Sequence, residues 1–230
     1  MVASSGIANA GVDSPNPKRD PGYDYLLLDL KRRPGQAGQR GAADHLASAA
    51  ASLAGRATLV GLFAPQLGWS AHQAAILLRW PDHGSDRQTV TTALVGDVAM
   101  VRERHELTPT LRPTGRDAPK PGGIYVHRWF TVRESSLPEF LRLSAQGWSD
   151  FEQRFDANIF GLFRAEQTSA DRTAGVVRLL LLTRYGSHAV WEASRDPTTA
   201  AMKSFARRQA LTLDTGAVST VLVPPPDAPA

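Results

Sequence analysis

The chain has 230 residues, of which 42% are hydrophobic and 21% are charged, so it is long enough for one large domain or two small ones. It contains no cysteine, which excludes a disulfide scaffold, a thiolate nucleophile and cysteine-ligated zinc or iron–sulfur centres. The formal net charge is +4, but the 26 lysines and arginines are spread over the whole chain, so we expect no nucleic-acid partner.

Both ends of the chain have compositions that disfavour a packed core. Residues 1–22 are rich in Ser, Gly, Pro and Asn and are predicted to form a disordered leader without the features of a signal peptide. Residues 224–230 form a proline-rich tail, which lacks the backbone donors that a helix or a sheet needs. No apolar run approaches the roughly 18 residues of a membrane-spanning helix, so we expect a cytoplasmic protein without membrane contact.

In the first half of the chain, apolar alternation and helical spacing predict six elements. They are a strand at 23–31, an alanine-rich helix at about 39–56, strands at 57–64 and 73–80, a helix at about 85–98 and a strand at about 106–112.

The second half repeats this order. It has a strand at 124–132, a helix, strands at 157–166 and 175–185, a helical segment at 187–208 with a break near Pro197, and a last strand at 211–223. The first of these helices carries one apolar stripe, formed by Leu137, Phe140, Leu141, Ser144, Trp148, Phe151 and Phe155. Ser136 and Glu139 have the spacing of a capping box at its start.

Landmarks recur about 100 positions apart. Tyr25 and Tyr125 each open an apolar strand, and Gly61 and Gly161 each lie in a Gly-Leu-Phe sequence. A stretch rich in Gly and Pro separates the two halves. We therefore expect a repeat at 23–114, a linker at 115–123 and a second repeat at 124–223.

The element order β-α-β-β-α-β is that of the ferredoxin-like plan, here present twice. Such a sheet has helices on one side only, and its bare apolar face must be covered. The sequence therefore predicts an α+β fold in which two tandem ferredoxin-like repeats pack sheet to sheet as a pseudo-dimeric α/β barrel. A small-molecule pocket is expected between the sheets. A homo-oligomer is compatible with this arrangement but is not required by it.

Several short motifs resemble those of the NIPSNAP family. The stretch YLLLDLKRRPG from Tyr25 resembles its opening strand and Pro-Gly turn, and YVHRWFTV from Tyr125 resembles the same strand with Arg128 at the strand arginine. NIFGLF at 158–163 and YGSHA at 185–189 resemble its second strand and its strand-to-helix turn. The resemblance implies the dimeric α/β-barrel superfamily, which includes haem enzymes, cofactor-free oxygenases, isomerases, cyclases and proteins without an established reaction. Leu28 stands at the strand-arginine position of the first half, which indicates that the second half carries the chemistry.

The strand at 124–132 holds the main candidate residues. Alternation places Tyr125, His127 and Trp129 on one face and Arg128 on the other, but the sequence does not settle which face lines the cavity. His127 is a candidate general acid or base, with Tyr125 and Trp129 as substrate-binding walls. Packing among aromatic residues is the alternative for His127. Arg128 is a candidate holder of a carboxylate or enolate, or else a partner in a structural salt bridge.

A second cluster lies where the strand at 175–185 meets the next helix. Arg184 and His188 are candidate catalytic residues there, and Tyr185 is a candidate substrate-binding residue, because a helix start offers free backbone amides to an anion. Ser187 is predicted to cap the helix. Trp69, in the loop between two predicted strands, is placed to close over a cavity mouth or to form an interface.

No histidine or carboxylate cluster has metal-ligand spacing, and no nucleotide-binding or esterase motif occurs, so no metal or nucleotide is expected. The leading hypothesis is a cofactor-independent enzyme that performs proton transfer (isomerisation or cyclisation) or oxygenation on an apolar or aromatic metabolite. The first alternative is a non-catalytic ligand-binding or assembly protein of NIPSNAP type. The second is a haem-binding barrel, with His127 or His188 as the axial ligand.

Overall fold

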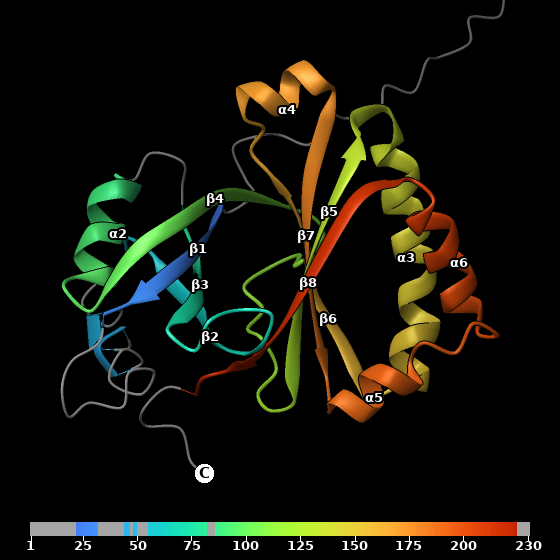
Figure 1. The fold of residues 1–230 in the computed structure, drawn as a ribbon, viewed down its shortest axis with the longest axis horizontal. Helices are drawn as coiled ribbons and strands as arrows, with labels where there is room; N and C mark the ends of the chain where they lie inside the picture. The colour runs from blue at the N-terminus through green and yellow to red at the C-terminus, as the bar shows by residue number, and fades with distance from the viewer. Residues whose placement is uncertain (1–21, 32–43, 47, 50–54, 82–85, 225–230) are drawn as a thin grey trace, which may run out of the picture.

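Eight strands, all paired antiparallel, close into one barrel in the order β1–β3–β2–β8–β5–β7–β6–β4 (Figure 1). The computed structural model describes residues 22–31, 44–46, 48–49, 55–81 and 86–224. The strands are β1 Tyr23–Leu30, β2 Thr58–Leu67, β3 Gln73–Arg79, β4 Ala99–Arg112, β5 Ile124–Arg133, β6 Ala157–Ala165, β7 Val176–Tyr185 and β8 Thr212–Leu222.

Each half of the chain contributes four neighbouring strands to the barrel. The first half gives β4–β1–β3–β2 and the second gives β8–β5–β7–β6, and the pairs β2–β8 and β4–β6 join the two sets. The same relative order in both halves is consistent with two ferredoxin-like repeats, and it confirms the predicted fold class. The exact boundaries of the repeats and the linker stay a prediction.

The helices lie outside the barrel, with α2 on the side of the first half and α3 and α6 on the side of the second (Figure 1). Their bounds are α2 Arg87–Val95, α3 Leu137–Arg154, α4 Ser169–Ala174, α5 His188–Ala193 and α6 Ala200–Gln209, with a 3-10 turn η1 at Glu134–Ser136. α3 buries most of the predicted stripe, including Phe140, Trp148 and Phe151. None of the described helices is long and apolar enough to cross a membrane.

The helix starts confirm one predicted cap and correct another. The Ser187 side chain accepts a hydrogen bond from the backbone N–H of Val190 at 3.2 Å, as predicted. Ser136 makes no such bond at the start of α3, because its backbone is already helical there (φ −91°, ψ −8°) at the end of η1. An N-cap side chain needs a non-helical backbone to reach the free amides.

Other differences from the predicted elements are local. The predicted helical segment 187–208 divides into α5 and α6 around Pro197, as expected, and β4 begins seven residues before the predicted strand, at Ala99. The short α4 was not predicted, since it has a capping box but no buried side chain that would give an apolar pattern. Most of the predicted helix at 39–56, and nearly all of the predicted leader and tail, lie outside the described residues.

The alternation along each strand separates the apolar side chains into three layers. One cluster lies between the barrel and the helices of the first half, a second between the barrel and α3 and α6, and a third inside the barrel. Inside, rings from the two halves meet edge to face: Tyr23 contacts Phe163 with centroids 5.2 Å apart, and Phe63 contacts Tyr125 at 5.3 Å. Large aromatic side chains therefore pack the space in which the sequence predicted a chamber.

Candidate functional site

His127 lies inside the barrel, so the odd-numbered face of β5 is the interior face. Its Nδ1 is 2.8 Å from the Tyr25 hydroxyl and its Nε2 is 3.0 Å from the Thr220 hydroxyl. The ring also contacts Phe63 and Trp69, with centroids 4.7 and 5.6 Å away, and the residue is fully buried. Burial lowers the pKa of His127 to about 3, so the ring is neutral at physiological pH and both ring nitrogens are already hydrogen-bonded.

Tyr125 and Trp129 share this interior face, as the alternation predicted. The Tyr125 hydroxyl donates to the backbone carbonyl of Lys120 at 2.7 Å, and the Trp129 ring lies 4.7 Å from the ring of His105. Trp69, which follows β2, lies half-buried against His127, so it covers that histidine rather than an open mouth. These contacts describe a packed interior with a hydrogen-bonded histidine at its centre.

The second predicted cluster is dispersed by the structure. Arg184 forms an ion pair with Asp156 at 2.7 Å and donates from Nε to the Gly122 carbonyl at 3.1 Å, which ties the end of β7 to two loops. The Arg184 guanidinium lowers the pKa of Asp156. His188 is exposed at the start of α5, with its Nε2 3.2 Å from the Ser219 hydroxyl.

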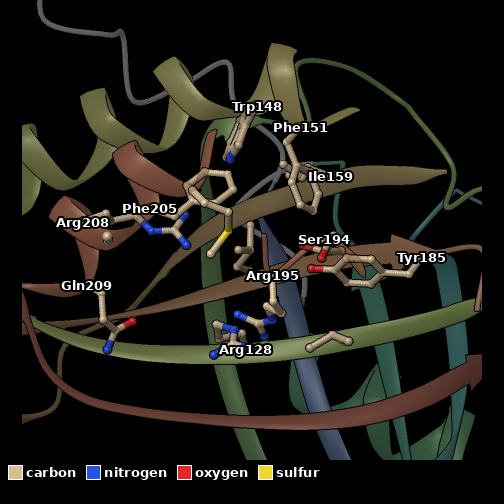
Figure 2. A pocket seen from close by; sticks show the side chains of 15 residues that line it. Arg128, Trp148, Phe151, Ile159, Tyr185, Ser194, Arg195, Phe205, Arg208 and Gln209 are labelled. Carbon is tan, nitrogen blue, oxygen red and sulfur yellow. The ribbon is translucent and has the colours of Figure 1, made fainter. Parts of the chain in front are cut away.

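A pocket with a volume of about 210 Å³ lies on the other side of the second sheet, between β5, β6 and β7 and the helices α3 and α6 (Figure 2). Its apolar wall includes Trp148 and Phe151 from α3, Phe205 from α6, and Ile159 and Leu181 from the sheet. This position corrects the expectation of a pocket between the two sheets.

Three arginines from three segments reach this pocket: Arg128 from β5, Arg195 from the connection after α5, and Arg208 from α6. Figure 2 shows their guanidinium groups turned toward the same space. No aspartate, glutamate or histidine is among the described residues that line the pocket. Within the described part of the chain, none of the three forms an ion pair with a carboxylate, so the structural salt bridge considered for Arg128 is not seen there.

Arg208 is held by aromatic rings rather than by a counter-charge. Its guanidinium lies 4.6 Å from the ring centroid of Phe205 and 5.0 Å from that of Phe130, and it donates to the Ser144 hydroxyl at 3.3 Å. The residue is 7% exposed, and its buried Nε has no hydrogen-bond partner. Arg195 is exposed, and its guanidinium lies 4.7 Å from the ring centroid of Trp191. Stacking on rings fixes a guanidinium in place while leaving N–H groups free to donate.

The pocket has the electrostatics of an anion site. Burial lowers the pKa of Arg208 to about 10, with a further contribution from the positive charges of Arg128 and Arg195. Burial and the charge of Arg195 likewise lower the pKa of Arg128. Burial raises the pKa of Tyr185, so its hydroxyl stays protonated and can donate a hydrogen bond. A carboxylate, enolate or phenolate oxygen bound here would relieve the mutual repulsion of the arginines.

The structure thus separates the predicted site residues into two groups. The interior side of the sheet carries His127, Tyr125, Trp129 and Arg184. The helix side carries Arg128 and Tyr185. No single site therefore contains both His127 and Arg128. In the first half, the position that corresponds to Arg128 is occupied by Leu28, which is fully buried in the apolar layer under the helices. The charged pocket is therefore a feature of the second half.

Arg195 and Arg208 are not among the site residues that the sequence predicts. Arg208 had a detectable signal, because it falls on the buried face of α6 with Ala201 and Ser204, three to four residues apart. A charged residue within a buried helical stripe indicates a special environment. Arg195 lies in a connection between helices and carries no such pattern.

No histidine is among the described residues that line this pocket, so none of them is placed to ligate a haem there. Both nitrogens of His127 are hydrogen-bonded on the opposite side of the sheet, and Nε2 of His188 contacts Ser219 at the surface. Haem ligation by histidine needs a free ring nitrogen directed into the cofactor slot. No group of three or more metal-ligating side chains occurs among the described residues.

Gly147 sets the distance between the two helices that cover the pocket. A Cβ at this position of α3 would overlap the ring of Phe205 on α6. We expect Gly147→Ala to lower the free energy of unfolding by about 1 kcal/mol, because overpacking costs about 1 to 3 kcal/mol and outweighs the gain of about 1 kcal/mol in helix propensity. Urea denaturation measures this change. Ala145→Gly, at an exposed position of the same helix, is the control, because it measures the difference in helix propensity between Ala and Gly without a contact to Phe205. A stabilised Gly147→Ala variant would show that Phe205 does not press on this site.

Comparison with known proteins shows the fold but not the family. No family model and no curated protein sequence matches the chain. A variant of chlorite dismutase from Candidatus Nitrospira defluvii superposes with a TM-score of 0.60 and 9% identity, covering 89% of this chain and 91% of that one. An anthrone oxidase-like protein superposes with a TM-score of 0.55 and 14% identity, covering 89% and 92%.

A NIPSNAP domain protein from Burkholderia xenovorans is also similar, with 17% identity. It covers 46% of this chain and 99% of its own, with a TM-score of 0.35, which is too low to support a family assignment. Membership of the NIPSNAP family therefore stays a prediction. What the comparisons show is the dimeric α/β-barrel fold over most of the chain.

Proposed function

We propose that the protein is a small-molecule enzyme whose helix-side pocket binds an apolar or aromatic substrate with an acidic oxygen. The observation that carries this proposal is the convergence of Arg128, Arg195 and Arg208 on an apolar pocket whose described lining contains no carboxylate. Arg208 is buried and Arg128 is half-buried, whereas Arg195 is exposed. Holding the first two charges without a counter-charge is costly for the free protein. Sites that bear such a cost are typical of ligand binding.

The same arrangement supports a chemical role. A substrate ring would lie against Trp148, Phe151 and Phe205, with its oxygen toward the guanidinium groups. Fixed positive charge at this oxygen lowers the pKa of an enol or a phenol, so the substrate ionises more readily. Tyr185 would donate a hydrogen bond to the same oxygen. An ionised enol can serve as the intermediate of a cofactor-independent isomerisation, cyclisation or oxygenation. One of the structural neighbours is named anthrone oxidase-like, and an anthrone is an aromatic ketone that forms such an enolate.

A second candidate function follows from what the lining lacks. No histidine or carboxylate among the described lining residues is available as a proton acceptor, and His127 lies on the other side of the sheet. This favours, as the alternative, a non-catalytic protein that holds the same anionic ligand. In the enzyme, solvent would have to take the proton from a substrate whose pKa the arginines have lowered.

Native mass spectrometry of the protein as purified tests the shared part of both functions. We expect a retained small organic anion in the wild type, reduced at least about tenfold in Arg128→Gln, because the lost hydrogen bonds involve a charged donor. Arg133→Gln, on an exposed arginine at the end of the same strand, should retain the ligand. Equal retention in Arg128→Gln would contradict the proposal. Conversion of the ligand into a product during incubation would separate the enzyme from the binding protein.

A further inference from the structure

The pocket contains more positive charge than one carboxylate can satisfy. Arg128, Arg195 and Arg208 come from three segments, and no carboxylate among the described residues pairs with any of them. A single carboxylate forms one bidentate pair with one guanidinium and has few acceptor positions left for the others. Arg195 is exposed to solvent, but a ligand with one negative charge would still leave either the half-buried Arg128 or the buried Arg208 without a counter-charge of its own.

Two buried donors on the lining also lack partners. The Nε of Arg208 and the Nε1 of Trp148 are buried and make no hydrogen bond, in residues that are 7% and 4% exposed. Buried donors normally have a partner, and an unpaired one marks a place where an acceptor is missing. Both side chains line the pocket, one from α6 and one from α3 (Figure 2). Several acceptor oxygens close together would satisfy them along with the other guanidinium groups.

We infer that the natural ligand carries two negative charges on neighbouring oxygens, as a dicarboxylate or a phosphate monoester, attached to a small apolar body. This inference rests on the proposed function and specifies its substrate class. The ring-sized body follows from the volume of about 210 Å³ and from the aromatic wall formed by Trp148, Phe151 and Phe205. Larger drug-sized ligands occupy pockets of roughly 300 to 1,000 Å³.

Matched ligands test the charge requirement. Isothermal titration calorimetry would compare benzoate, phthalate and phenyl phosphate at one salt concentration, near pH 8, where phthalate and phenyl phosphate each carry two charges. Benzoate and phthalate share the ring and differ by one carboxylate, whereas phenyl phosphate places both charges on one group. We expect at least one of the two dianions to bind about tenfold or more tightly than benzoate, since each added charged hydrogen bond is worth about a factor of ten.

A pair of neighbouring arginines on α6 provides the variant and its control. Arg208→Met should reduce the preference for the dianion to about threefold or less, because it removes one counter-charge from the pocket. Arg207→Met should leave the preference unchanged, because Arg207 points to solvent with a side chain that is 65% exposed. A dianion preference that persists in Arg208→Met would overturn the inference. If benzoate binds as tightly as both dianions, the inference of a dianionic ligand is overturned and the proposed function stands. If none of the three ligands binds, both the inference and the proposed function are overturned.

Discussion

Replacing Arg208 by methionine is expected to make the ligand-free protein more stable, by about 1 to 3 kcal/mol. Arg208 is 7% exposed and has no carboxylate partner among the described residues. Its pKa is lowered to about 10, first by burial and then by the neighbouring arginines, which means that the folded protein holds the charge at a cost. Methionine is apolar, of similar length and flexible, so it can fill the space among Phe130, Phe140 and Phe205.

Urea denaturation and thermal melting of the purified, ligand-free protein measure this effect. A gain of 1 kcal/mol corresponds to a rise of about 2 to 4 °C in the melting temperature of a protein of this size. Arg207→Met, next to it on the exposed side of α6, should change the free energy of unfolding by less than about 0.5 kcal/mol. A loss of stability in Arg208→Met would show that its ring contacts and its hydrogen bond to Ser144 outweigh the cost of the buried charge.

Replacing His127 by glutamine is expected to remove a large part of the acid sensitivity of the fold. The pKa of His127 is about 3 in the folded protein and near 6.5 in an unfolded chain. Below pH 6.5 the unfolded chain therefore binds a proton that the folded protein does not, so this contribution to stability is lost as the pH falls from about 6.5 to about 3. The loss amounts to at most about 5 kcal/mol, at about 1.4 kcal/mol per pH unit.

Glutamine keeps a donor and an acceptor for Tyr25 and Thr220 but does not titrate. The measurement is the free energy of unfolding at several pH values between 3.5 and 7.5 for both proteins. We expect the wild type to lose more stability than the variant over this range, whatever the absolute stability of the variant. His188→Gln replaces an exposed histidine and should keep the acid sensitivity of the wild type. Parallel pH profiles for wild type and His127→Gln would mean that the buried imidazole is protonated within the folded protein.

The fold was predictable because its evidence is distributed over the whole chain. Eight strands and the order of helices between them follow from local alternation and spacing, and the offset of about 100 residues between Tyr25 and Tyr125 reveals the two similar halves. A sheet with one bare apolar face then requires a cover, and the other half provides it. Each of these steps needs only the period of the pattern, not the packing of individual side chains.

The site was less predictable, because it depends on which face of each strand meets which layer. The alternation of β5 separated His127 from Arg128 correctly, but only the packed structure shows that Arg128 faces the helices. Arg195 and Arg208 reach Arg128 from segments more than 60 residues away, and no spacing rule connects them. The aromatic filling of the barrel likewise depends on contacts between strands of different halves, such as Tyr23 with Phe163.

The most direct test of the account is a crystal structure of the protein with phthalate or phenyl phosphate bound. We expect ligand density between β7 and α6, with acidic oxygens in contact with Arg128 and Arg208 and a ring against Phe205. Density inside the barrel beside His127, with the helix-side pocket empty, would contradict it.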